Sequence, residues 1–176
     1  MISIGASPDH GFDEPISLMA DCHRRIEMFI GVLLRVATVL EGAPLEGDAA
    51  AAVRRALAYF AEAAPRHTAD EEESLFPRMR AAQGGRIEAI DRLESDHAEA
   101  ERLLSAVKRG FEEWIERGEL GESPRSALLD SIRLLRDHFA RHIREEEEDV
   151  FPLGRRLLSP EALRSIGREM RARRRH

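Results

Sequence analysis

The sequence has little cysteine and no long apolar run, and each absence excludes a class of protein. Cys22 is the only cysteine and cannot form an internal disulfide, which agrees with a reducing compartment. No stretch of about 18 consecutive apolar residues is available to span a bilayer. Residues 1–13 lack the basic start and apolar core of a signal peptide. We therefore expect a cytoplasmic protein with no membrane partner.

Positive charge is also in the minority. The chain has 27 Lys and Arg residues against 33 Asp and Glu residues, which gives a net charge of −6. Binding a phosphate backbone requires a basic face, so this balance disfavours nucleic acid as a partner. The one basic cluster lies at the C-terminus and contains Arg171, Arg173, Arg174 and Arg175. We interpret it as a solvated helix end or frayed tail.

Strand patterns are absent, and residues that favour helices dominate. The 12 glycines and 8 prolines mostly fall between periodic segments, while Ala, Leu, Arg and Glu are abundant. No stretch shows the alternation of a half-buried strand. Apolar residues recur instead at three- and four-residue steps, as on one face of a helix. This pattern predicts long helices at residues 16–40, 48–80, 86–117 and 123–155, and a short fifth helix from Ser159.

These elements predict an all-α fold. Four long helices with connections of roughly four to eight residues favour an antiparallel up-down-up-down four-helix bundle with a short C-terminal fifth helix. We expect Asp48 and Ser123 to be N-caps and Pro65 to cause a kink or bulge. The chain then divides into a flexible lead-in, the bundle, and a C-terminal helix with a basic tail, at residues 1–13, 14–158 and 159–176.

One sequence motif occurs twice in the chain. Each copy reads H-x3-E-x4-F-P, and the copies occupy residues 67–77 and 142–152. A further histidine precedes each copy, His23 by 44 positions and His97 by 45. The spacing predicts two pseudo-repeats about 75 residues apart. A pseudo-twofold axis between them would bring the two H-x3-E segments together near the middle of the bundle.

The repeated histidines and glutamates are candidate metal ligands. A lone histidine on an apolar face is usually a core residue, but here each long helix supplies one histidine in repeat register. Two helices add a glutamate four residues later, on the same face and about 5–6 Å away. Burying these groups unpaired would cost several kcal/mol per charge, which a bound cation removes. Most of the neighbouring acidic residues fit a solvated face, whereas Glu72 and Glu147 are ambiguous.

On these motifs the chain resembles the hemerythrin-like HHE cation-binding domain family over residues 16–158. The resemblance implies a four-helix bundle that holds a non-haem di-iron centre, with two iron ions and two bridging carboxylates. The motifs that carry it are Asp21-Cys22-His23, His67-x3-Glu71-x4-Phe76-Pro77, Asp96-His97 and His142-x3-Glu146-x4-Phe151-Pro152. The implied ligands are His23, His67, Glu71, His97, His142 and Glu146.

The third helix departs from the pattern of oxygen-carrying hemerythrins. Those proteins have a second histidine one turn after the first, whereas this chain has Glu101 four residues after His97. We predict Glu101 as a seventh ligand. Glu27 occupies the matching place in the first repeat and is a weaker candidate, and His138 is expected to be a supporting or core residue.

Three functions fit the sequence. The leading one is a di-iron protein that reacts with dioxygen, peroxide or nitric oxide in stress response or sensing. Anionic ligands stabilise ferric iron, which favours irreversible oxidation over reversible oxygen carriage. A second is metal storage or a zinc-filled site without redox turnover, since histidine and carboxylate also suit zinc. A third is a regulatory module with the arginine cluster as its handle. The oligomeric state is open, and no known nucleophile or phosphate-binding pattern is found.

Overall fold

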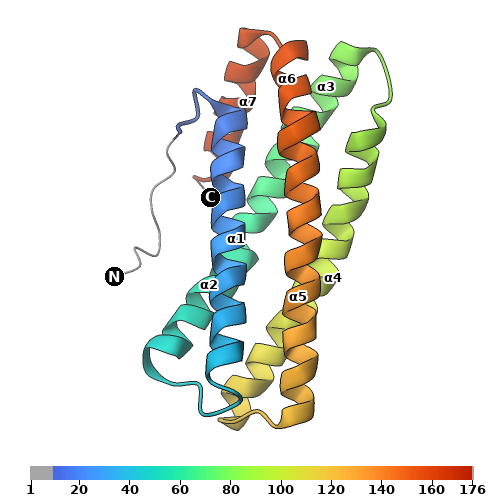
Figure 1. Cartoon of the computed structure of the whole chain (residues 1–176). Helices are drawn as coiled ribbons and strands as arrows, with labels where there is room; N and C mark the ends of the chain where they lie inside the picture. Colours follow the sequence, from blue (N-terminus) through green and yellow to red (C-terminus); the bar gives the residue numbers. More distant parts are fainter. Residues whose placement is uncertain (1–9, 176) are drawn as a thin grey trace.

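The computed structural model describes residues 10–175, and this part of the chain is helical throughout, without strands (Figure 1). The all-α prediction is confirmed. Four helical arms run in alternating directions, and a fifth helix packs against one end of them (Figure 1). The arms are α1 (Pro15–Val39); α2 (Gly47–Ala69), η1 (Asp70–Leu75) and α3 (Phe76–Gln83); α4 (Glu88–Arg117); and α5 (Glu122–Glu145), η2 (Glu146–Val150) and α6 (Phe151–Leu157). The fifth helix is α7 (Pro160–Arg173).

Helix boundaries lie within a few residues of those predicted, but both expected N-caps are wrong. Ser159 does cap α7, since its hydroxyl accepts a hydrogen bond from the Ala162 amide at 3.2 Å. Asp48 and Ser123 instead lie inside the first turns of α2 and α5, which begin one residue earlier than expected. No helix within residues 10–175 is long and apolar enough to cross a bilayer.

Two π turns interrupt the second and fourth arms at the repeated motif. The Phe76 amide donates to the carbonyl of Glu71, five residues back, and Phe151 does the same to Glu146. A proline follows each phenylalanine, and a proline has no N–H and displaces the carbonyl four residues before it. That carbonyl belongs to Glu73 before Pro77 and to Glu148 before Pro152, and both lie inside the π turns, so the wider turn accommodates the proline. A kink or bulge was expected at Pro65; the bulge is wrong, because α2 continues through that residue to Ala69.

The core is divided into two apolar clusters. One fills the end of the bundle near the α1–α2 connection, around Leu33 and Trp114, which are fully buried. The other fills the opposite end, where Phe76, Phe151 and Met170 pack together. Burying each such side chain stabilises the fold by about 1.5–3 kcal/mol. The histidine-bearing level lies between the clusters, so the bundle holds a polar layer enclosed by apolar packing on both sides.

Helix α7 belongs to the packed structure rather than to a solvated tail. Its apolar face buries Ile166 and Met170 completely in the second cluster. Arg173 and Arg174 continue the same face and pair with the buried carboxylate of Asp70. Interpreting all four terminal arginines as solvated is thus wrong for these two.

Residues 10–13 of the expected lead-in contact the bundle, whereas residues 1–9 lie outside the described part of the chain. The His10 side chain is 37% exposed, and its Nδ1 lies 3.1 Å from the buried Asp21 carboxylate. Phe12 packs against the second cluster, and the Arg171 guanidinium lies 5.1 Å from the centre of its ring. Adding a Cβ to Gly167 would place it 1.9 Å from the Phe12 carbonyl oxygen, so only glycine permits this close approach.

Candidate metal centre

Four histidines from four helices meet at one level of the bundle. His23 comes from α1, His67 from α2, His97 from α4 and His142 from α5. Their side chains are between 1% and 9% exposed. The rings of His23 and His67 lie 4.9 Å apart and those of His97 and His142 lie 4.8 Å apart, measured between centroids. Each pair of histidines therefore faces a common point.

Glu71 and Glu146 lie between these pairs, and each turns its two oxygens toward different histidines. In Glu71, Oε1 is 3.2 Å from Nε2 of His67, and Oε2 is 3.4 Å from Nε2 of His97. In Glu146, Oε2 is 3.0 Å from Nε2 of His23, and Oε1 is 3.4 Å from Nε2 of His142. Each carboxylate therefore connects one histidine pair with the other.

The six residues form two groups of potential ligands that share both glutamates. Within each group, one nitrogen or oxygen atom of every member lies within 4.8 Å of the others. The groups are His23, His67, Glu71 and Glu146, and Glu71, His97, His142 and Glu146. The structure thus brings together the six residues that the resemblance implied.

The polar atoms at the centre have no hydrogen-bond partners among the described residues. They include both oxygens of Glu71 and of Glu146 and Nε2 of His23 and of His97. A buried polar atom without a partner costs about 1–3 kcal/mol, and more if it is charged. A bound cation would accept electron pairs from all of these atoms. The donor set therefore fits a metal better than it fits a purely structural role.

The protonation states show how the centre balances its charges without metal. Burial raises the pKa of Glu71 well above its usual range, and the charge of Glu146 reinforces this. Burial also acts to raise the pKa of Glu146, but the adjacent rings of His142 and His23 outweigh it and hold the pKa well below its usual range. Burial acts to lower the pKa of His23, yet the neighbouring carboxylates of Glu146 and Glu147 raise it to about 10. Glu71 and His23 therefore hold protons, and these protons offset part of the negative charge that a bound metal would otherwise balance.

His67 behaves oppositely to His23. Burial, reinforced by the nearby charge of His23, lowers the pKa of His67 well below its usual value. His67 is therefore neutral at physiological pH, which is the form that binds a metal.

Two further carboxylates orient the histidines of α1 and α4. Oε1 of Glu147 lies 2.8 Å from Nδ1 of His23, and Oε1 of Glu72 lies 2.6 Å from Nδ1 of His97. A carboxylate on the outer ring nitrogen fixes the ring orientation and leaves Nε2 free to bind a metal. The roles of Glu72 and Glu147 were open in the sequence. Each follows a ligand glutamate directly, and that position was the available signal.

Aromatic rings close the centre from the second apolar cluster. Phe151 stacks on His23 with ring centroids 5.4 Å apart and planes 10° apart. Phe76 lies parallel to His97, at 6.5 Å and 7°. Both phenylalanines are buried. The Phe-Pro half of the motif thus supplies an apolar cover over the histidines as well as the π turn.

Three candidates from the sequence lie outside both ligand groups. Glu101 and Glu27 are exposed. His138 donates from Nε2 to the Asp96 carbonyl at 2.9 Å, a supporting contact in α4. The seventh-ligand role of Glu101 stays a prediction.

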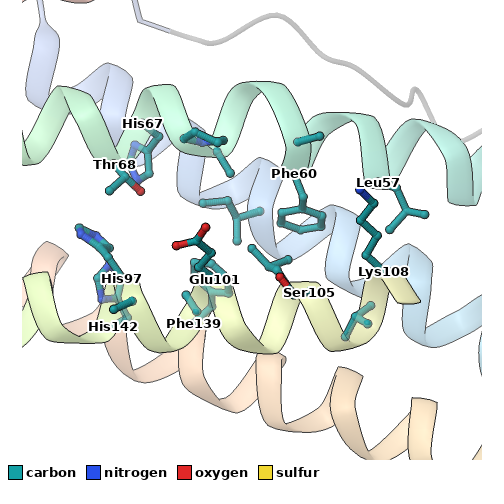
Figure 2. Close-up of a pocket in the computed structure, with 18 of the residues that line it drawn as sticks. Leu57, Phe60, His67, Thr68, His97, Glu101, Ser105, Lys108, Phe139 and His142 are labelled. Atoms are coloured by element: carbon teal, nitrogen blue, oxygen red, sulfur yellow. The ribbon is translucent and has the colours of Figure 1, made fainter. Parts of the chain in front are cut away.

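A cleft of about 690 Å³ between α2 and α4 leads to the centre (Figure 2). Three of the four histidines, His67, His97 and His142, line its inner end, and His23 does not. Figure 2 shows the Glu101 carboxylate projecting from α4 toward α2 beside this end. A small molecule can therefore reach the histidines from one side of the bundle.

Asp70, directly before Glu71, is fully buried and tied to α7. Arg173 Nη1 lies 3.0 Å from its Oδ1, and Arg174 Nη2 lies 2.7 Å from its Oδ2. Arg173 also donates to the hydroxyl of Ser74 at 2.9 Å. The fifth helix thus contacts the π turn that carries Glu71.

Comparisons with known proteins agree with this geometry. A family model described as the hemerythrin HHE cation binding domain matches residues 14–154. A protein of Haemophilus influenzae described as uncharacterized is 30% identical over 163 residues, which cover 93% of this chain and 91% of the relative.

Proposed function

Because this chain belongs to the hemerythrin HHE cation-binding family, we propose that it holds a non-haem di-iron centre that binds or reacts with dioxygen, peroxide or nitric oxide. The main support is that Glu71 and Glu146 each direct one carboxylate oxygen to the His23–His67 pair and the other oxygen to the His97–His142 pair. This arrangement fits two metals bridged by two carboxylates. Each metal would have two imidazoles and two carboxylate oxygens, which leaves room in an iron coordination sphere for a small molecule.

When bound, the two irons would supply electrons and Lewis acidity to that small molecule. The protein's own residues set the conditions. The carboxylates of Glu71 and Glu146 are anionic ligands in a buried site and favour ferric iron. Glu72 and Glu147 hold two histidine rings in orientation. The apolar clusters enclose the centre along the bundle axis, and the cleft between α2 and α4 is the route to it from the side. These features support reaction or sensing rather than reversible oxygen transport.

A second function is metal binding without redox turnover. Two histidines and two carboxylates also form a good zinc site, and the geometry of the side chains is compatible with either metal. A regulatory role through the basic tail has less support, because Arg173 and Arg174 pair with Asp70. We keep a cytoplasmic location within the proposal, since the single cysteine, Cys22, is free and buried.

The test is anaerobic purification with metal counting, followed by spectra on addition of oxygen, peroxide and nitric oxide. We expect about two irons per chain, because two ligand groups share the glutamates, and new visible bands on adding at least one of the three molecules. Zinc gives no visible charge-transfer band and would indicate the second function. A reproducible single mononuclear site would overturn the dinuclear proposal.

A further inference from the structure

The cleft between α2 and α4 is much larger than a diatomic ligand requires. Its volume is about 690 Å³, whereas a molecule the size of water occupies roughly 30 Å³ in the liquid. Pockets that bind organic molecules measure about 300–1,000 Å³ and are mostly apolar with a few polar groups. The size of this cleft therefore belongs to the range for organic ligands.

The walls of the cleft are largely apolar. Its lining includes Leu57 and Phe60 of α2, Leu104 of α4, Ile26 of α1 and Phe139 of α5 (Figure 2 labels Leu57, Phe60 and Phe139). Small side chains leave the space open, and Ala61 of α2 and Ala98 of α4 both line it. An apolar body placed here would lie along the two helices and be removed from water, which is favourable in proportion to the area covered.

The carboxylates that line the cleft differ in whether they already have partners. Glu72 contacts Nδ1 of His97 at 2.6 Å, and Glu94 accepts two hydrogen bonds from Arg80 at 2.7 and 2.8 Å. Glu101 has no hydrogen-bond or ion-pair partner among residues 10–175. Its negative charge is therefore available to a ligand, and it disfavours an anionic group at the histidine end of the cleft.

The outer end of the cleft carries a cation that is already paired. Lys108 follows His97 by eleven residues on α4, which corresponds to about 16 Å along the helix. Its Nζ lies 3.7 Å from a carboxylate oxygen of Glu112. The unpaired charge of the cleft is thus near the histidines, and the length available to a ligand is that of a short alkyl chain or a small ring system.

We propose that this cleft binds an elongated, mostly apolar organic molecule with a cationic or hydrogen-bond-donating group, which Glu101 recognises beside the metal centre. The inference names the class of molecule that the centre serves and so rests on the proposed function. Glu101 is in this view a specificity-determining residue. The organic molecule lies against the side of the centre that His67, His97 and His142 form.

The test uses the full chain in metal-free and zinc-loaded forms, so that binding is measured without redox chemistry. Octylamine, 1-octanol and octanoate are titrated by calorimetry, since they share a chain and differ in head group. We expect the amine and the alcohol to bind and octanoate to bind about tenfold more weakly than the amine. Glu101→Gln should remove most of this discrimination without preventing alcohol binding.

A pair of variants on one helix tests the location. Ala61 and Ala58 are both exposed on α2, but Ala61 lines the cleft and Ala58 lines a separate hollow beside Tyr59. Ala61→Phe should weaken all three probes at least about fivefold by filling space, and Ala58→Phe should leave them unchanged. Circular dichroism confirms that both variants fold.

Several outcomes overturn the inference. They are no binding at millimolar probe, equal affinity for amine and carboxylate, and equal effects of the two phenylalanine variants. A dimer in light scattering that Ala61→Phe dissociates would show that a second copy covers the cleft. Failure of the probes in a chain that holds about two irons contradicts this inference alone. Probe binding in a chain that never retains iron contradicts the proposed function instead.

Discussion

Asp70 and Glu145 occupy the same place in the two repeats, directly before a ligand glutamate, yet their surroundings differ. Asp70 is fully buried and pairs with Arg173 at 3.0 Å and Arg174 at 2.7 Å. Glu145 is 23% exposed and pairs at 2.6 Å with Arg92, which is itself 60% exposed. The residue before the first π turn is therefore attached to α7 by a buried ion pair, whereas the residue before the second π turn makes a surface ion pair with α4.

The candidate metal centre follows the pseudo-symmetry of the two repeats, whereas the contacts that support it from outside do not. The six candidate ligands obey the pseudo-symmetry, and so do the contacts of Glu72 and Glu147 with the histidines. The fifth helix does not, because α7 follows the second repeat in sequence but packs on the first repeat's π turn. A duplicated motif can thus keep its polar centre symmetrical while its two halves differ in the contacts that support them.

The largest effect should come from breaking the α7 attachment. The double variant Arg173→Ala with Arg174→Ala leaves the buried Asp70 without a cation, which should lower the free energy of unfolding by about 3 kcal/mol. Arg92→Ala removes the corresponding surface pair and should cost below about 1 kcal/mol. Urea unfolding of the metal-free chain measures both.

Two additional variants sharpen this result. Arg175→Ala removes an exposed terminal charge and should have little effect. Adding Asp70→Asn to the double variant removes the uncompensated charge and should recover part of the loss, as a double-mutant cycle can quantify. Equal losses for Arg92→Ala and the arginine double variant would mean that the two halves are supported alike.

The second prediction concerns metal affinity, in which the two halves should be equivalent. Glu72→Gln and Glu147→Gln each remove the charge that orients a ligand histidine, and each should weaken metal binding about 10–100-fold. Competition with a chelator measures this affinity. Glu148→Gln is the matched control, because Glu148 is exposed and adjacent to Glu147. A much larger effect at one of the two positions would show that the metals are held unequally.

The third prediction concerns pH in the metal-free chain. The pKa of His23 is raised to about 10 in the folded protein, above the usual histidine value of about 6.5. Its stabilising contribution is complete below the unfolded value and is lost as the pH rises toward 10. The raised pKa of Glu71 acts in the same direction. The lowered pKa of His67 acts only below its usual range and does not enter this window. Tm should therefore fall between pH 7 and 10.

The zinc-loaded chain should show a different profile. Metal binding requires neutral histidines, so acid should release the metal and lower Tm as the pH falls below the histidine range. Calorimetry at pH 7 in buffers of different ionisation enthalpy should show proton release on binding. Identical pH profiles of Tm with and without metal would contradict the assignment of His23 to the centre.

The smallest effect is expected at Glu101 and at its counterpart Glu27, because both lie outside the ligand groups. Either change to Ala should leave most of the iron bound through the six other ligands. If Glu101 is a seventh ligand, Glu101→Ala shifts the ferric spectrum, while Glu27→Ala does not. An unchanged spectrum in both Glu101→Ala and Glu101→Gln would remove Glu101 from the ligand set and leave it a role in the cleft alone.

Much of the centre could be predicted because it depends on helix periodicity. Apolar residues at three- and four-residue steps placed His23 and His97 on buried faces. The four-residue step from His67 to Glu71 placed both on one face, since side chains four apart lie one above the other. Family resemblance then supplied the bridging role, which the orientation of the carboxylate oxygens supports.

The π turns and the α7 contact were missed for different physical reasons. A π turn changes hydrogen-bond partners by one residue and leaves a pattern that still looks helical, so only Pro77 and Pro152 indicated a disturbance. The arginines resembled a terminal charged tail. Their spacing from Met170 continued the buried face of α7, however, and could have indicated burial.

The π turns also change the rotational phase of the bundle. Glu71 and Phe76 are five residues apart, and an uninterrupted α-helix would place them about 140° apart around its axis. Both are nevertheless fully buried, because the wider turn brings the later residue back toward the centre. Each π turn therefore shifts the rotational position, around the helix axis, of the residues that follow it. The buried faces before and after a π turn are determined independently. Residues at the level of the histidines can therefore change without altering which residues of either apolar cluster are buried.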